Sequence, residues 1–139
     1  MVTSRQCTIP MEHMTQSPHT LSLGDSVFAK VVAINFYGEG IMSNSGNGAT
    51  CVLVPTKPIY LTNDGAVTTE SQIGFTWSQG ISTGGRPILD YRISYDQGIN
   101  DWQILESVAD AEYTTTVPII SGQTYKFYVE ARNEVGYSP

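Results

Sequence analysis

Apolar and polar residues alternate along much of the second half of the chain. Between residues 71 and 78 the apolar side chains fall two positions apart, at Ile73, Phe75 and Trp77. Side chains at every second position share one face of a β-strand, so this spacing predicts a strand with one buried face. Three further segments show the same period: 88–95, 113–117 and 124–132. The pattern therefore predicts at least four short strands.

Turn-forming residues separate these runs. The breaks are Gly84–Pro87, Asp96–Gly98, Asp110–Ala111 and Ser121–Gly122. Glycine, proline, asparagine and aspartate favour the backbone angles that tight turns need. No segment longer than a turn has a 3.6-residue period, so we expect almost no helix. Short strands joined by such turns favour an antiparallel β-sandwich.

An internal repeat indicates tandem modules. Residues 24–38 align with residues 122–136 at a constant offset of 98 residues. Five pairs are identical: Gly24/Gly122, Val31/Val129, Ala33/Ala131, Asn35/Asn133 and Gly38/Gly136. An offset near the length of one sandwich domain is typical of repeated modules. The first copy carries an insertion, residues 11–23, which contains both histidines.

These residues resemble the fibronectin type III module. The resemblance rests on Trp77, on the run 85–95, on Ser121–Tyr125 and on the run 129–136. It covers residues 55–139 as strands A, B, C, C′, E and F, and residues 7–55 as strands E, F and G of a preceding module. It therefore implies an all-β fold of immunoglobulin-like antiparallel β-sandwich modules in tandem, both of them incomplete. The implied domains are residues 1–55 and residues 56–139, the second lacking its last strand.

The same pattern assigns structural roles. We expect Trp77, Tyr91 and Val129 to fill the space between the sheets, with Val31 as the matching core position of the first copy. Tyr125 lies where a sandwich places its tyrosine corner, a phenol that caps a backbone group. In the turn after the last strand, Asn133 and Gly136 are expected to take left-handed backbone angles. Two prolines, Pro55 and Pro58, suit the junction between modules because they stiffen it.

Two cysteines, Cys7 and Cys51, are too few for a disulfide framework. Strand parity puts Cys7 on the same side as Ile9, towards the core, which allows a disulfide between the two sheets. The alternative is a pair of buried free thiols that pack as small hydrophobes. The sequence leaves both open.

Charge excludes several classes of partner. Among 139 residues, 7 are basic and 13 acidic, a net charge of −6 with no basic cluster. Such a chain lacks the phosphate-tracking surface of a nucleic-acid-binding protein and the basic patch of a membrane-surface protein. No stretch approaches the ~18 apolar residues of a membrane span, and the first ten residues lack the apolar core of a secretory signal.

Candidate chemistry is sparse. Glu12, His13 and His19 lie close in sequence and could ligate a metal, but no further ligand has helical or hairpin spacing, so a solvated loop is the simpler interpretation. The run 96–101 has oxygen ligands and a glycine but lacks the length and closing glutamate of a calcium loop, which favours a hairpin turn. We expect no catalytic residues, no cofactor, no metal and no small-molecule substrate.

The implied function is mechanical or adhesive. We expect a non-enzymatic building block of an extracellular or cell-surface protein, whose partners are neighbouring modules or copies of itself. Incomplete sandwiches expose strand edges that something must cover. We therefore expect either a piece of a longer tandem array, whose next segments supply the missing strands, or a chain that assembles head to tail into filaments by strand addition. The alternatives are a receptor module, with a ligand surface formed by loop 80–84 and by the loop from Asp96 to an exposed Trp102, and a spacer in a large cytoskeletal protein. We expect Trp102 to pack beneath strand C′, which would argue against the receptor.

Overall fold

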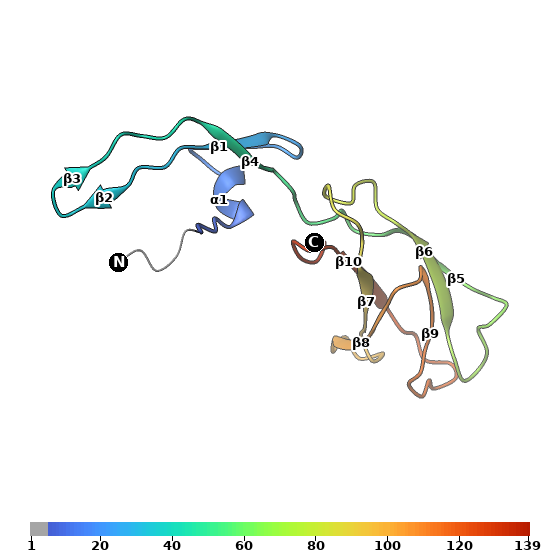
Figure 1. Cartoon of the computed structure of the whole chain (residues 1–139). Helices are drawn as coiled ribbons and strands as arrows, with labels where there is room; N and C mark the ends of the chain where they lie inside the picture. The colour runs from blue at the N-terminus through green and yellow to red at the C-terminus, as the bar shows by residue number, and fades with distance from the viewer. Residues whose placement is uncertain (1–5) are drawn as a thin grey trace. The chain divides into compact units, whose positions relative to one another are not determined.

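The computed structural model describes residues 6–139 and divides the chain into two compact units (Figure 1). The first unit is Met1–Val52 and the second is Leu53–Pro139. Almost all regular structure is β-strand, in antiparallel pairs throughout. The fold is therefore the all-β class that the alternation predicts.

The second unit contains two three-stranded sheets. One sheet has the order β5-β6-β9, with β5 at Ile59–Asn63, β6 at Gly74–Ser78 and β9 at Glu112–Thr114. The other has the order β10-β7-β8, with β7 at Asp90–Tyr95, β8 at Gln103–Val108 and β10 at Phe127–Arg132. Neighbouring strands run antiparallel in both sheets.

The alternating apolar residues form the core of this unit. Its buried members are Phe75, Trp77, Tyr91, Ile93, Tyr113, Val129 and Ala131. The Trp77 and Tyr91 rings meet edge to face with centroids 5.4 Å apart, an arrangement that aromatic pairs prefer. Because these side chains come from both sheets, the core lies between the two layers.

The alternating pattern predicts two strands, β6 and β9, to be longer than they are in the structure. β6 begins at Gly74, three residues later than the alternation suggests, because residues 69–72 form a turn in which the Thr69 amide donates to the Gln72 carbonyl. β9 ends at Thr114, although Thr115 extends the contact by donating its amide to Ile73. Edge strands β5 and β8 bury little of either face, so no period marks their limits.

The first unit is a long hairpin preceded by one short helix. The helix α1 spans Met11–Thr15. β1 (Ser26–Ala29) pairs antiparallel with β4 (Gly46–Thr50), and β2 (Ile34–Asn35) pairs with β3 (Gly38–Glu39). Among the described residues of this unit, Cys51 alone is buried. This unit therefore has one layer and no apolar core of its own in the described residues.

The repeated segments form the same turn in both units. In the first unit the Tyr37 amide donates to Asn35 Oδ1 at 2.8 Å. The Val135 amide donates to Asn133 Oδ1 at the same distance, 98 residues later.

Backbone pairing around this turn repeats as well. The Gly40 amide donates to the Ala33 carbonyl at 2.8 Å, and the Ser138 amide donates to the Ala131 carbonyl at 2.8 Å. The pairing of Ile34 with Glu39 corresponds to that of Arg132 with Tyr137 at the same offset. The same hydrogen bonds recur 98 residues apart, so both copies of the repeat fold into the same local motif.

The predicted core position Val31 is wrong. Val31 is 70% exposed, whereas its partner in the repeat, Val129, is 6% exposed. The difference follows from the second layer, because Val129 packs in the core cluster with Trp77 and Tyr91, and the single-layered first unit has no such sheet.

The disulfide that the sequence allows does not form. Cys7 and Cys51 are both free, with Cys7 exposed and Cys51 fully buried. Strand parity fails at Cys7 because residues 6–10 are not in a strand and lead directly into α1, which leaves Ile9 53% exposed. The alternative of two buried thiols therefore describes Cys51 and not Cys7.

Candidate functional site

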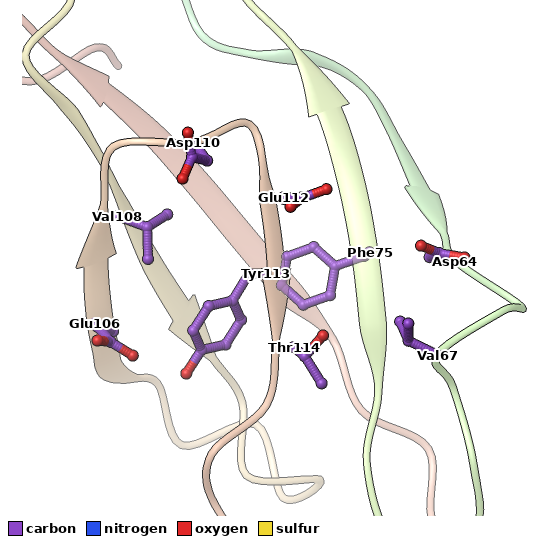
Figure 2. A pocket seen from close by; sticks show the side chains of 9 residues that line it. All are labelled: Asp64, Val67, Phe75, Glu106, Val108, Asp110, Glu112, Tyr113 and Thr114. Carbon is purple, nitrogen blue, oxygen red and sulfur yellow. The ribbon is translucent and has the colours of Figure 1, made fainter.

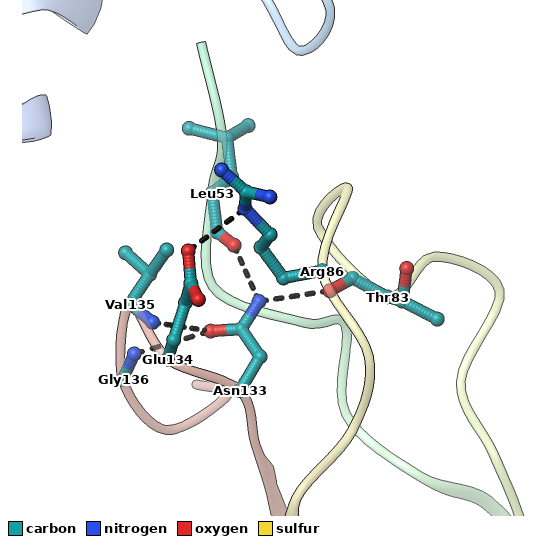
Figure 3. Close-up of polar contacts among 7 residues, drawn as sticks. All are labelled: Leu53, Thr83, Arg86, Asn133, Glu134, Val135 and Gly136. Atoms are coloured by element: carbon teal, nitrogen blue, oxygen red, sulfur yellow. Dashed lines mark hydrogen bonds and ion pairs between the residues drawn. The ribbon is translucent and has the colours of Figure 1, made fainter. Parts of the chain in front are cut away.

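The turn after β10 holds the start of the second unit in place (Figure 3). Asn133 is 2% exposed, and its Nδ2 donates to the carbonyls of Leu53 at 2.7 Å and Thr83 at 2.8 Å. Its Oδ1 accepts from the amides of Val135 at 2.8 Å and Gly136 at 3.2 Å. All the polar atoms of this buried amide are therefore satisfied, as a buried side chain requires.

The role of Asn133 differs from the predicted one. Of these two residues, Asn133 has no positive φ and Gly136 has a φ of +155°. The side chain of Asn133, rather than an unusual backbone angle, shapes the turn and joins three segments that are distant in sequence.

Residues 53–57, the leading segment, lie against the loop between β6 and β7. The Leu53 amide donates to the Gly84 carbonyl at 2.9 Å, and the Thr56 amide donates to the Ser82 carbonyl at 2.9 Å. The Ser82 amide in turn donates to Thr56 Oγ1, also at 2.9 Å. Pro55 between them is fully buried. The leading segment is therefore a structural part of the second unit rather than a free connection.

Two glycines allow this close approach. A Cβ atom on Gly84 would lie 2.0 Å from the Leu53 carbonyl oxygen, and Gly84 also has a φ of +72°. A Cβ on Gly80 would lie 2.4 Å from Thr56 Oγ1. The turn pattern predicts Gly84 as a turn residue but does not predict its contact with Leu53. The sequence signal for such a close approach is the Gly84–Gly85 pair, because glycine lets two backbone segments lie side by side.

At the rim, Arg86 Nε and Glu134 Oε1 form an ion pair at 2.8 Å. Both side chains are about half exposed, so water screens the pair and its contribution to stability is small. The buried amide of Asn133 therefore makes the stronger link between the turn and the leading segment.

The outer face of the β10-β7-β8 sheet carries a ladder of charge pairs. Arg92 bonds Glu130 through two nitrogens, at 2.6 and 2.8 Å, and Arg132 bonds Asp90 in the same way. The hydrogen bond to Glu130 raises the pKa of Arg92 above its ordinary value. The Arg92 guanidinium lies 3.8 Å from the centre of the Tyr137 ring, a cation–π contact. These contacts hold the chain after β10 against the sheet.

The loop between β7 and β8 is a hydrogen-bonded turn. Asp96 is 3% exposed, and its Oδ1 accepts from the amides of Lys126 and Gly98, each at 2.9 Å. The bond from Lys126 is the main cause that lowers the pKa of Asp96, with the bond from Gly98 acting in the same direction. Gln97 and Asn100 take left-handed φ values of 53° and 59°. The Asp96 carboxylate is thus used internally.

Tyr125 occupies the corner position. Its hydroxyl accepts the Ile120 amide at 3.0 Å, five residues upstream, and so caps the turn before β10.

The candidate metal ligands do not converge. His13 Nε2 lies 3.9 Å from Glu12 Oε1, with both side chains exposed, and His19 follows in the loop after α1. Within residues 6–139, no group of three or more histidine, cysteine, aspartate or glutamate side chains is placed to hold a metal ion.

A shallow cavity of about 310 Å³ opens between β8 and β9 (Figure 2). Val67, Val108 and the rings of Phe75 and Tyr113 provide its apolar lining. Four carboxylates also line it: Asp64, Glu106, Asp110 and Glu112. The cavity is therefore acidic and open to solvent.

Trp102 lies in a more exposed place than expected. It is 49% exposed and meets Tyr128 of β10 edge to face, with centroids 6.4 Å apart. The prediction that Trp102 packs beneath strand C′, which corresponds to β8, is therefore wrong. Ile104 on β8, two residues after Trp102 in the sequence, is 62% exposed.

Among residues 6–139, β10 is an edge strand of its sheet, and Tyr137 and Ser138 cover the part of its outer edge at Ala131 and Arg132. Both backbone groups of Ala131 bond Ser138, so by alternation those of Phe127 and Val129 point to the same edge. At the matching position of the first unit, the backbone groups of Val31 bond Ser43 at 2.9 Å. A cavity of about 250 Å³ lies beside this edge, lined in part by Leu61, Ile73, Phe75, Tyr125 and Phe127.

Comparison with known proteins gives two curated relatives, while no family model matches the chain. One is Protein turtle of Drosophila melanogaster, 34% identical over 87 residues. That alignment covers 61% of this chain and 6% of the relative. The other is the Titin homolog of Caenorhabditis elegans, 26% identical over 120 residues, covering 84% of this chain and 1% of the relative. The chain thus spans a very small part of both proteins.

Solved structures identify the fold. A crystal structure of consecutive titin domains matches with a TM-score of 0.62 and 22% identity, covering 83% of this chain and 38% of that chain. The solution structure of a human fibronectin type III domain matches with a TM-score of 0.58 and 23% identity, covering 66% and 77%. The fold is that of immunoglobulin-like and fibronectin type III β-sandwich modules, as the sequence resemblance implied.

Proposed function

We propose that this chain is a non-enzymatic segment of a long tandem-module protein, in which it spaces and connects neighbouring modules. The observation that carries the proposal is the turn motif that recurs in both units at one offset, with the same hydrogen bonds. Recurrence of a local motif along a chain is the mark of a modular array, whose units contact mainly their neighbours.

The comparisons support this role. Both curated relatives are far longer than the chain, which covers 6% and 1% of them. The structural matches include titin domains. The leading segment, which is bonded into the second unit, gives a defined path for tension along the chain.

Stretching the whole chain between two marker domains tests the proposal. A spacer module should resist tension and then unfold in one cooperative event that releases its 87 residues. At ~3.5 Å per residue, this event lengthens the chain by about 250–300 Å. Gradual extension without such an event would contradict a mechanical role.

Head-to-tail assembly is a second candidate, favoured by the edge of β10 beside Phe127 and Val129, with which no strand pairs among residues 6–139. A strand from another copy could pair with Phe127 and Val129 and cover the apolar cavity beside them. Such a contact does not close on itself and would produce filaments. Sedimentation velocity over a concentration series, with negative-stain microscopy, should then reveal regular fibres. A monomer at every concentration excludes this candidate.

An adhesive protein outside the cell and a spacer in a large cytoskeletal protein both fit a modular chain. We propose neighbouring modules or further copies as the partners. Within residues 6–139, no helix has the length and apolarity needed to cross a membrane.

A further inference from the structure

We propose that Asn47 in β4 is a modification site, at which the side-chain amide is lost through a reaction with the backbone of Gly48. The product is an aspartyl or isoaspartyl residue, and no enzyme is needed to form it. The proposal concerns the covalent chemistry of the first unit, and it does not depend on the spacer function.

The sequence places the two reacting groups next to each other. Asn47 precedes Gly48, and this is the one Asn-Gly pair among the 139 residues. The backbone nitrogen that follows an asparagine can attack the side-chain carbonyl carbon, because a five-membered ring closes between them. A side chain on the following residue obstructs this attack, and glycine has none. Asn47 is therefore the asparagine whose neighbour hinders the reaction least.

The structure leaves the Asn47 side chain unrestrained. Asn47 is exposed, and its side-chain amide makes no hydrogen bond within residues 6–139. By contrast, the side-chain oxygens of Asn35, Asn63 and Asn100 each accept a hydrogen bond from another residue. The Asn47 side chain can therefore turn towards the Gly48 nitrogen without breaking a hydrogen bond.

The backbone at Gly48 is open as well. The register between β1 and β4 pairs Val27 with Ala49 and Phe28 with Asn47, and so skips Gly48. An extra residue in one strand forms a β-bulge, which interrupts the ladder locally. A Cβ atom added at Gly48 would also meet nothing within 4 Å. The Gly48 nitrogen can therefore approach Asn47 without displacing a packed neighbour.

The reaction needs no reagent except water. The Gly48 nitrogen loses its proton and forms a bond with Cγ of Asn47, while the bond between Cγ and Nδ2 breaks and the nitrogen leaves as ammonia. Water then opens the resulting succinimide ring. Opening at the side-chain carbonyl gives aspartate, and opening at the backbone carbonyl gives isoaspartate, whose main chain runs through Cβ. Either product adds one negative charge to the net charge of −6.

Isoaspartate should also disturb the pairing of the hairpin. It adds one atom to the main chain at Asn47, which pairs with Phe28, beside the pair of Gly46 and Ala29. Strand pairing depends on register, and the first unit has no apolar core in the described residues to hold β1 against β4 in another way. We therefore expect the modification to loosen β1 and β4 and to leave the core of the second unit intact.

Peptide mass spectrometry on the whole chain after prolonged incubation at neutral and alkaline pH tests the site. Asn44 is the internal reference, because it is also exposed and its side chain makes no hydrogen bond within residues 6–139, but Ser45 follows it. We expect loss of the amide at Asn47 several-fold faster than at Asn44, faster still at alkaline pH, with isoaspartate among the products. Equal rates at the two asparagines, or aspartate without isoaspartate, would overturn the proposal.

Gly48→Ala and its matched control Gly46→Ala test the attacking group. Both glycines lie in β4, and a Cβ atom at either meets nothing within 4 Å. G48A should slow amide loss at Asn47 several-fold, whereas G46A should leave the rate unchanged. If G48A fails to fold, Asn47→Gln keeps an amide but requires a six-membered ring, so its amide should also be lost several-fold more slowly. An unchanged rate in the variant used would mean that the Gly48 nitrogen does not attack.

Amide hydrogen exchange tests the structural consequence. The modified protein should exchange several-fold faster than the fresh protein at Val27 and Ala29 of β1, and equally at buried Ile93 of the second unit. Unchanged exchange in β1, or an equal increase at Ile93, would overturn the expected loosening of the hairpin.

Discussion

At the residue scale, two buried side chains in the second unit have opposite polar environments. The indole Nε1 of Trp77 is buried without a hydrogen-bond partner. Asp96 is at least as buried as Trp77, yet its carboxylate accepts two backbone amides through one oxygen. Trp77 therefore stabilises the unit by its apolar surface alone, whereas Asp96 stabilises it through its charge and hydrogen bonds.

Substitutions at Trp77 should separate shape from polarity. Trp77→Ala removes a large core side chain and should lower the free energy of unfolding by about 3–5 kcal/mol. Trp77→Phe should cost much less, about 1–2 kcal/mol, because the lost N–H bonds nothing. Urea unfolding followed by circular dichroism measures both, with half-exposed Trp102→Ala as the control of small effect. Equal losses for the two Trp77 variants would contradict this view of the indole nitrogen.

Asp96 should make the stability of the unit depend on acid. Its pKa is lowered in the folded state, chiefly by the Lys126 amide, so its stabilisation is complete above the ordinary value of 3.8. That stabilisation is lost as the pH falls through the lower folded pKa. Asp96→Asn should therefore weaken the unit at neutral pH and flatten the pH dependence of unfolding below the ordinary value of 3.8.

Urea unfolding at a series of pH values between 7 and 2 tests this prediction about Asp96. The exposed carboxylate of Asp101, in the same loop, provides the matched variant Asp101→Asn. If the two variants have the same pH profile, the buried hydrogen bonds of Asp96 are not the source of the acid sensitivity.

At the element scale, the second unit depends on segments that are not regular strands. The leading segment, the loop before β7 and the turn after β10 meet at Asn133. Such irregular backbone must satisfy its polar groups through specific partners, because no sheet neighbour supplies them. Close approach of the first two segments requires a residue without a side chain at Gly84.

Gly84→Ala should therefore disturb the leading segment. Its φ of +72° disfavours alanine, and the added Cβ would meet the Leu53 carbonyl oxygen. We expect a loss of about 1–3 kcal/mol in the free energy of unfolding. Gly65→Ala is the matched control, since a Cβ there meets nothing within 4 Å, and it should change stability by less than ~0.5 kcal/mol. Similar results for both variants would show that the contact is not strained.

What the sequence predicts depends on how much of each element is buried. Alternation located β7 and β10 to within three residues because one face of each is in the core. β5 and β8 lie at sheet edges, and their exposed faces leave no period. Val31 shows the converse, because a core-like residue stays exposed where no second layer covers it.

The leading segment escaped sequence reasoning for a different reason. Its attachment uses the backbone of Leu53 and the side chain of Asn133, which are 80 residues apart. Backbone hydrogen bonds place no constraint on residue type, so they leave no pattern to read. The repeat predicts Asn133 as a turn residue, but the contacts of its amide nitrogen depend on tertiary structure alone.

At the scale of the whole molecule, the two units differ in how they can be stable. The second contains the buried aromatic cluster between two sheets. In the first, large apolar side chains remain exposed among the described residues, including Phe28 at 65%, Phe36 at 97% and Ile41 at 98%. Hydrophobic burial is the main source of folding free energy, so cooperative stability should belong to the second unit.

A fragment of residues 53–139 should therefore unfold at the same temperature as the second unit within the whole chain. Near-ultraviolet circular dichroism reports on the packed aromatic rings and can follow this transition in both proteins. The fragment includes the leading segment, so the bonds of Asn133 to Leu53 and Thr83 are preserved.

A fragment that begins at residue 58 supplies the matched comparison. It leaves the amide of Asn133 with a buried donor whose Leu53 partner is gone, and it removes buried Pro55. Losing a hydrogen bond in a buried site costs about 1–3 kcal/mol, which lowers the midpoint by roughly 5–15 °C for a domain of this size. If both fragments melt with the whole chain, the leading segment contributes nothing to the fold. A lower midpoint for the 53–139 fragment would instead mean that the first unit stabilises the second.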